Sequence, residues 1–193
     1  MFEAGLLLVA VRAATLIAAG DAPPPMGLTV PKAAWVMRVP SAAFEMKQQQ
    51  VKPDGTAAYF MMSDATTHLN LSFFIEPIKD CATAAECRDW AWKAEQTRLS
   101  GIEGVRQSEI GDAAVVEWLQ PRLGKLQIDQ KNMHAYWVKE GYWIDAHVSK
   151  VAYQESDRER FVELIRAIDF VPKSDVAPEP KSGDVPPPHG NPM

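Results

Sequence analysis

Alternation of apolar and polar residues predicts a run of strands before the first helix. The clearest example is residues 67–76, THLNLSFFIE, because side chains of a strand point alternately to its two faces. One face of this strand carries Leu69, Leu71, Phe73 and Ile75. A Pro-Asp-Gly turn at 53–55 separates two earlier runs. Further strands are predicted at residues 33–39, 44–51, 56–63, 105–110, 113–120, 125–130, 133–139 and 142–149.

Two segments have the 3.6-residue period of a helix packed on one side. The first begins at Thr83, which forms a capping box with Glu86. Its predicted buried stripe is Cys87, Trp90, Ala91 and Ala94. The second begins at a capping box of Ser156 and Glu159 and ends at Pro172. Its predicted buried stripe is Phe161, Leu164, Ile165 and Ile168.

Strands, helix, strands and helix follow one another, with tight turns between neighbouring strands. This order predicts an α+β domain with a mostly antiparallel sheet covered by two main helices, an α/β sandwich. The order of elements over about residues 33–171 resembles the PsbP-like α/β sandwich, a fold of export-targeted accessory proteins of photosynthetic and other bacterial membranes. The resemblance lies in the topology, so it carries over no functional residue. What it implies is an accessory role.

The ends of the chain differ in composition from its middle. Residues 1–22 are apolar and end in small residues, with cleavage near Gly20 or Ala22, as in a secretory signal peptide. The match is imperfect because Glu3 is acidic and Arg12 interrupts the apolar stretch. An N-terminal helix of a cytosolic protein is the alternative, whereas a membrane anchor would need a longer uncharged run. The predicted organisation is a signal peptide at 1–22, a Pro-rich linker at 23–28, one domain at 29–172 and a disordered Pro-rich tail at 173–193.

The chain has two cysteines, Cys81 and Cys87, on either side of the first helix start. A zinc site needs about four ligands, and a thioredoxin-type redox centre has two intervening residues rather than five. The chain reversal at a helix entry brings these two positions together, so we expect a structural disulfide. Export would permit that bond, and two free thiols are the remaining alternative.

The segment from Met133 to Ser149 reads as a hairpin with its turn at Glu140-Gly141. A two-residue loop pairs Trp137 with Ile144 and keeps one face apolar, whereas a three-residue loop would mix the two faces. The two-residue register therefore predicts a second, aromatic and polar face. On that face His134 lies across from His147 and Tyr136 lies across from Asp145, beside Trp143.

We interpret this face as a docking surface for an envelope or secreted protein, made of Tyr136, Trp143, Asp145, His147 and His134, with Phe74 nearby. A divalent transition metal, or acid–base catalysis by the histidine pair, is the alternative. The metal ligands would be His134, His147, Asp145 and, if its strand is adjacent, His68.

Charge and motifs narrow the function further. The net charge is −5 and the pI is about 5.4, which argues against a nucleic-acid partner. The sequence has no phosphate-binding loop and no nucleophile elbow. The leading prediction is therefore a non-catalytic accessory or binding protein, periplasmic or secreted, with no cofactor and no integral membrane span.

Overall fold

The computed structural model describes residues 24–40 and 44–175. Within them, ten strands form two antiparallel sheets, and two α-helices pack against the larger sheet. The helices are α1 (Ala84–Glu95) and α2 (Arg158–Arg166). The strands are β1 (Met26–Leu28), β2 (Trp35–Val39), β3 (Glu45–Val51), β4 (Ala58–Ser63), β5 (Asn70–Pro77), β6 (Glu103–Ile110), β7 (Ala113–Leu123), β8 (Leu126–Lys139), β9 (Tyr142–Lys150) and β10 (Asp169–Pro172).

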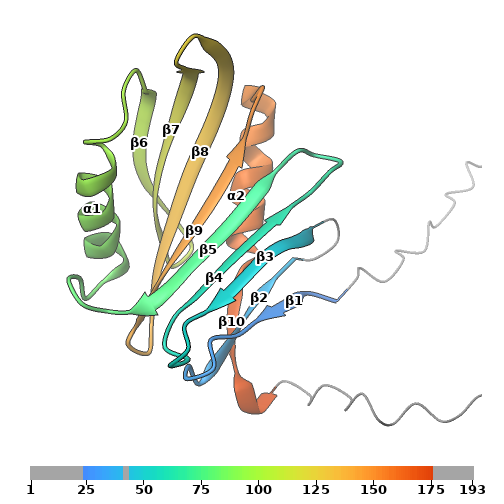
Figure 1. Cartoon of the computed structure of the whole chain (residues 1–193), viewed down its shortest axis with the longest axis vertical. Coiled ribbons are helices and arrows are strands. Elements are labelled where there is room, and N and C mark those ends of the chain that lie inside the picture. Colours follow the sequence, from blue (N-terminus) through green and yellow to red (C-terminus); the bar gives the residue numbers. More distant parts are fainter. Residues whose placement is uncertain (1–23, 41–43, 176–193) are drawn as a thin grey trace, which may run out of the picture.

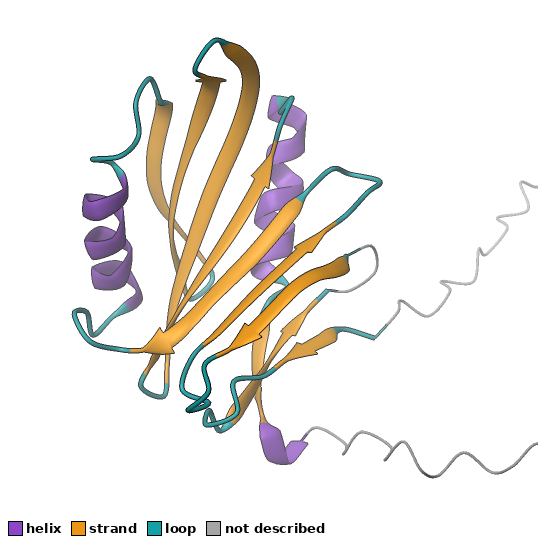
Figure 2. Ribbon diagram, viewed as in Figure 1, coloured by secondary structure: helices purple, strands orange, loops and turns teal. Residues whose placement is uncertain are grey.

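The elements form three layers around a seven-stranded sheet of order β3-β4-β5-β9-β8-β7-β6 (Figure 1). One face of this sheet packs against α2 and against the three-stranded sheet β1-β2-β10, and this interface holds the main hydrophobic core. The other face carries α1, which contacts β7 and β8. Figure 2 shows α1 near the β6 edge and α2 behind the strands. The predicted α+β sandwich is confirmed.

The two faces of the central strands follow the predicted alternation. In β5 the apolar set Leu71, Phe73 and Ile75 is fully buried in the main core. Phe74, which points to the other face, is 50% exposed. The two segments predicted at 125–130 and 133–139 are one continuous strand, β8, although Asp129 within it has φ 43° opposite a bulge in β7.

The three-stranded sheet contains the elements that the sequence did not predict. β1 lies inside the range expected to be linker, and β10 occupies a stretch assigned to the second helix. That helix ends at Arg166, and Pro172 closes β10, not the helix. Both short strands exist because β2 pairs with each of them. An ion pair between Arg38 and Asp169 joins β2 to β10.

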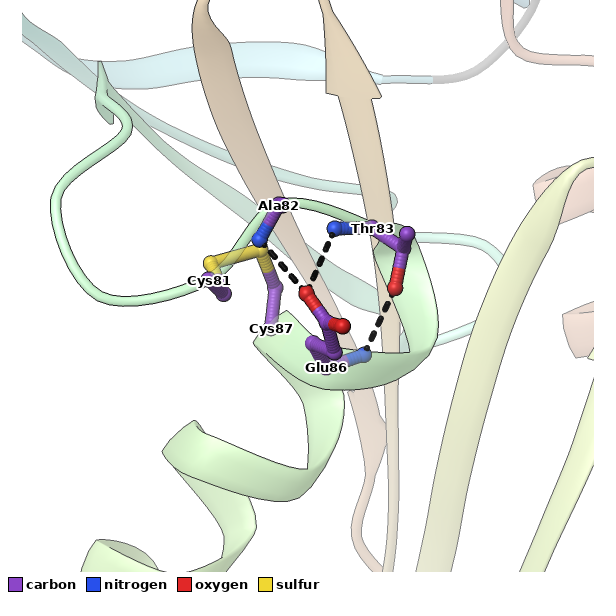
Figure 3. Close-up of a disulfide and its surroundings, with 5 residues drawn as sticks. All are labelled: Cys81, Ala82, Thr83, Glu86 and Cys87. Carbon is purple, nitrogen blue, oxygen red and sulfur yellow. Dashed lines mark hydrogen bonds between the residues drawn. A yellow bond between two sulfur atoms is a disulfide. The ribbon is translucent and has the colours of Figure 1, made fainter.

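The start of α1 has the predicted capping box. Glu86 N–H donates to Thr83 Oγ1 at 3.2 Å, and the Glu86 carboxylate accepts from Thr83 N–H at 3.2 Å and Ala82 N–H at 2.8 Å (Figure 3). Cys81 and Cys87 form a disulfide across this turn, with their Cα atoms 5.0 Å apart. The predicted disulfide is confirmed. It fixes the entry of α1 relative to the end of β5.

The start of α2 differs from the prediction. Ser156 lies inside a short 3-10 turn, Glu155–Asp157, and makes no capping box with Glu159. Instead the carboxylate of Asp157 accepts from Gln154 N–H at 2.9 Å and pairs with Lys150 Nζ at 2.7 Å. Asp157 therefore closes the 3-10 turn that precedes α2, and its side chain makes no capping bond to α2 itself.

A buried carboxylate ties α2 to the sheet. Glu117 of β7 is 0% exposed and lies on the α2 side. Its oxygens pair with Arg158 Nη2 at 2.8 Å, Lys131 Nζ at 3.1 Å and Arg106 Nε at 3.3 Å. Burial alone would raise the pKa of Glu117, but hydrogen bonds from Arg158 and Lys131 outweigh it and lower the pKa below its ordinary value. One carboxylate thus holds β6, β7, β8 and α2 together.

The predictions for residues 1–22 and for most of the C-terminal tail lie outside the described residues. In the described part of the chain, no helix has the length and apolarity needed to cross a bilayer.

Candidate functional site

The β8–β9 hairpin has the register that side-chain alternation favoured. Glu140 and Gly141, both at positive φ, form its two-residue loop. Such φ values are typical of the turns that fit the twist of a hairpin. His134 lies opposite His147, and Tyr136 lies opposite Asp145. All the polar residues of the predicted face therefore project from the side of the sheet that carries α1.

The ring systems on this face stack in parallel. The rings of His134 and His147 have centroids 4.2 Å apart and planes 13° apart. Trp118 of β7 stacks on the other side of His134, at 5.3 Å and 11°. Tyr136 and Trp143 stack in the same way at 6.1 Å and 7°. The face is therefore a set of aligned planar groups, and each imidazole presents mainly its edge to solvent or to a neighbour.

Hydrogen bonds fix the protonation of the two histidines. The carboxylate of Asp145 can only accept, so the proton lies on His134 Nδ1, 2.8 Å from Asp145 Oδ1. His147 Nε2 lies 3.0 Å from Asn132 Oδ1 and donates to it. Asn132 Nδ2 donates to the main-chain carbonyl oxygen of Gln130 at 3.3 Å, which leaves Asn132 Oδ1 as the acceptor for His147. Each histidine therefore has one ring nitrogen engaged by a neighbour on its own face.

His147 should make the stability of the protein depend on pH. Burial, and then the charge of His134, lower the pKa of His147 well below 6.5. In the unfolded chain His147 gains a proton below about pH 6.5, whereas in the folded chain it stays neutral to lower pH. The free energy of unfolding should therefore be highest above about pH 6.5 and fall as the pH is lowered, by up to about 2 kcal/mol at about pH 5.

Urea unfolding of the wild type, His147→Gln and His68→Gln at several pH values measures this effect. Glutamine can still donate to Asn132 but does not titrate, so His147→Gln should lose most of the slope. His68 is exposed, and its replacement should leave the slope intact. A slope unchanged in His147→Gln would show that another group causes the pH dependence.

Helix α1 closes part of the predicted docking face. Tyr136 is 3% exposed and packs with Val116 and Trp118 in a second small core beneath α1. Burial raises the pKa of the Tyr136 hydroxyl, and the charge of Asp145 raises it further. Trp143 is half-buried and meets Trp90 edge-on at 5.8 Å. Tyr136 thus supports the face from below, while Trp143 lies at its margin.

The buried side of α1 differs from the predicted stripe. Cys87 is fully buried, but Trp90 is 47% exposed and Ala94 is exposed. Ala91 packs on the second core as predicted, and Trp92 joins it there in place of Trp90, with the Trp92 ring 5.1 Å from that of Trp118. The helix is rotated toward Trp92 because Trp118 on the sheet offers the larger apolar contact.

A groove of 530 Å³ remains open between the C-terminal end of α1 and the middle strands. Its floor holds the histidine pair and Asp145, with Phe74 on the β5 side. The His134 and Asp145 side chains are 17% and 14% exposed. Its wall and end are formed by Glu95, Arg98, Leu99, Ser100, Arg122, Leu123, Gly124 and Ile128. The predicted residues His134, Asp145 and His147 thus line one hollow.

The groove does not present the histidine pair to a shared metal. A ring nitrogen directs its lone pair in the plane of its own ring, and the two planes are nearly parallel. His68 does not join the pair. It lies at φ 59° before the start of β5, four residues from Ser72, which faces His147. Among the described residues, no group of three His, Cys, Asp or Glu side chains could hold a metal ion.

Sequence reasoning did not identify Trp118 as a groove residue. It is 3% exposed, yet it lines the groove and stacks on His134. The β7–β8 register places it opposite Asn132. Strand alternation would have found it if the register of β7 had been known, but a bulge between Gln120 and Arg122 hides that register.

Comparisons with known proteins place the fold. Neither the models of protein families nor the curated proteins match this sequence. Among solved structures, the chain is similar to the solution structure of cyanobacterial PsbP (CyanoP) from Synechocystis sp. PCC 6803, with a TM-score of 0.51 and 13% identity. The alignment covers 80% of this chain and 96% of that one. The chain has a PsbP-like fold. At this identity the likeness concerns topology, so the PsbP-like fold positions the groove but assigns it no ligand.

Proposed function

We propose that this chain is a non-catalytic binding protein of the bacterial envelope that takes a segment of a protein partner in the groove beside α1. The observation that carries the proposal is Phe74, a large aromatic side chain that is 50% exposed at the margin of a groove with a polar floor. Aromatic anchors beside satisfied polar groups are typical of protein interfaces.

The polar floor supports binding rather than catalysis. Asp145 is engaged by His134, and His147 is engaged by Asn132. Within the described residues, no serine or threonine hydroxyl hydrogen-bonds to either imidazole, as nucleophilic catalysis by such a pair requires. These groups can still offer ring edges and lone pairs to the main chain of a bound segment.

The disulfide and the fold support the location. A structural disulfide such as Cys81–Cys87 persists in oxidising compartments and is rare in the cytosol. The PsbP-like neighbour and the apolar start of the chain agree with export. We therefore place the binding module in the periplasm or outside the cell.

Photocrosslinking from the groove tests the proposal. A photoreactive phenylalanine replaces Phe74 in the full chain, expressed in the organism that carries the gene. The matched control carries the same group at Val105, which is 46% exposed on the edge strand β6. We expect one discrete adduct with an envelope protein from position 74 and none from position 105.

The partner identified in this way is then purified and titrated. Phe74→Glu should weaken its binding at least about tenfold, because it puts a charge where an aromatic anchor packed. Val105→Glu should leave binding unchanged. Identical adducts from both positions, or no adduct from position 74 in processed and folded protein, would contradict docking in the groove.

A further inference from the structure

The β7–β8 hairpin projects beyond the rest of the sheet. Its strands are the longest in the described chain, with 11 and 14 residues, and its turn lies at one end of the long axis of the molecule (Figure 1). Gly124 and Lys125 form a two-residue loop between Leu123 and Leu126, which pair across the hairpin. Gly124 has φ +60°, which a glycine at the first loop position adopts without strain. The tip is therefore a narrow, well-defined turn.

The tip exposes two leucines side by side. Leu123 is 70% exposed and Leu126 is 64% exposed, more than any other large apolar residue of the described chain. Directly paired residues on antiparallel strands have their Cβ atoms about 5 Å apart, so the two side chains form one apolar cap. Turns at a surface are normally polar, and a paired apolar tip marks a contact with something outside the molecule.

The same tip is cationic in an acidic protein. The chain has a net charge of −5, but residues 119–128 contain Arg122 and Lys125 and no acidic residue. Both side chains are exposed, and among the described residues neither has a carboxylate within 4.0 Å. An apolar cap between two free cations is complementary to a surface with anionic headgroups over a hydrocarbon layer.

We propose that the β7–β8 hairpin tip binds the surface of an anionic lipid bilayer. Leu123 and Leu126 enter the boundary between headgroups and acyl chains, and Arg122 and Lys125 bind lipid phosphates. A bilayer fits this tip better than a protein does. A stable protein interface buries about 800 Å² on each partner and needs shape complementarity, whereas a bilayer accepts a narrow wedge.

This contact does not rest on the proposed protein partner, although Arg122 and Leu123 also line the end of the groove. A chain held by its tip would present the groove close to the membrane surface, where an envelope protein could reach it. The tip lies at the opposite end of the sheet from the β8–β9 turn, so bilayer contact leaves the Trp143 margin free.

Co-sedimentation of the full chain with lipid vesicles tests the proposal. The vesicles contain equal parts of phosphatidylglycerol and phosphatidylcholine, and vesicles of phosphatidylcholine alone are the reference. We expect binding to the anionic vesicles that weakens as salt is added. Leu123→Ser with Leu126→Ser should weaken vesicle binding about tenfold or more, because both side chains that would enter the bilayer are lost. Arg122→Gln with Lys125→Gln should weaken it roughly fivefold for each charge and remove most of the salt dependence.

Two controls separate a specific wedge from general stickiness. Val105→Ser removes another exposed apolar side chain, on β6, and should leave vesicle binding unchanged. Leu126→Trp places a reporter at the tip, and lipids brominated on their acyl chains should quench its added fluorescence relative to the wild type. Because all the tip side chains are exposed, the tip variants should have the far-UV circular dichroism spectrum and the urea midpoint of the wild type.

The proposal is overturned by any of three results. The first is no binding of the folded wild type to anionic vesicles. The second is binding that the double leucine variant retains. The third is a concentration-dependent dimer, seen by size-exclusion chromatography with light scattering, that the leucine variant abolishes while vesicle binding is absent. That last result would assign the tip to a second copy of the chain.

Discussion

Replacing Glu117 with glutamine is expected to lower the free energy of unfolding by about 3–5 kcal/mol, the range for breaking a buried ion pair from one side. The carboxylate is completely buried and faces three cations, of which Lys131 is 10% exposed and Arg158 is 25% exposed. Without its charge, these two side chains keep most of their desolvation cost and lose their counter-charge. Urea unfolding at neutral pH measures the loss.

Two matched variants show whether the loss of stability in Glu117→Gln comes from the buried cluster. Arg106→Gln removes the third cation, but that side chain is 57% exposed, so its cost should stay below about 1 kcal/mol. Glu109→Gln removes an exposed carboxylate from the neighbouring strand and should be close to neutral. If Glu117→Gln also costs less than about 1 kcal/mol, the cluster is not what holds α2 against the sheet.

Most features set by residues close together in the sequence were predicted well, the capping box of Ser156 and Glu159 being the exception. The capping box at Thr83, the disulfide and the β8–β9 register each depend on residues within one turn of helix or on a two-residue loop. In such segments steric rules and alternation leave few arrangements. The pairing of His134 with His147 followed from keeping Trp137 and Ile144 on one apolar face, and the structure has that pairing.

Features set by distant residues were not predictable in the same way. Arg158 lies 41 positions from Glu117, and an isolated glutamate in a strand does not indicate its partners. β10 is a strand only because β2 is beside it, and its own four residues carry little signal. The order of strands decided that β5 adjoins β9 and that His68 lies beyond the paired region. Alternation within one strand does not reveal which other strands lie beside it.

The buried face of α1 was predicted only in part. The predicted buried stripe ran through Trp90, whereas Trp92 lies on the adjacent face of the same helix. The choice depends on what the sheet offers opposite the helix. The structure places Trp118 there, and Trp92 is the side chain that meets it. The face of α1 could be assigned only once the register of β7 was known.

Trp118→Ala is expected to lower the free energy of unfolding by about 3–5 kcal/mol, as for other buried tryptophans. Trp118 is 3% exposed and contacts both Trp92 of α1 and the ring of His134. Its loss leaves a cavity under the helix, so amide hydrogen exchange in α1 should accelerate more than in α2. Trp90→Ala removes an indole that is 47% exposed and should cost less than about 1 kcal/mol. An equal cost for the two variants would mean that α1 packs through the stripe containing Trp90.

Trp118→Phe separates the role of the ring from that of the indole N–H. The N–H is buried and has no hydrogen-bond partner within the described residues, so its removal forfeits no bond. Phenylalanine keeps most of the ring contact, and this variant should lose far less stability than Trp118→Ala. Trp118 also supports His134 at the groove floor. Trp118→Phe should therefore keep the binding of the groove partner. Trp118→Ala should weaken both that binding and the packing of α1. If Trp118→Phe is as unstable as Trp118→Ala, the N–H has an acceptor, and the packing argument for Trp118 fails.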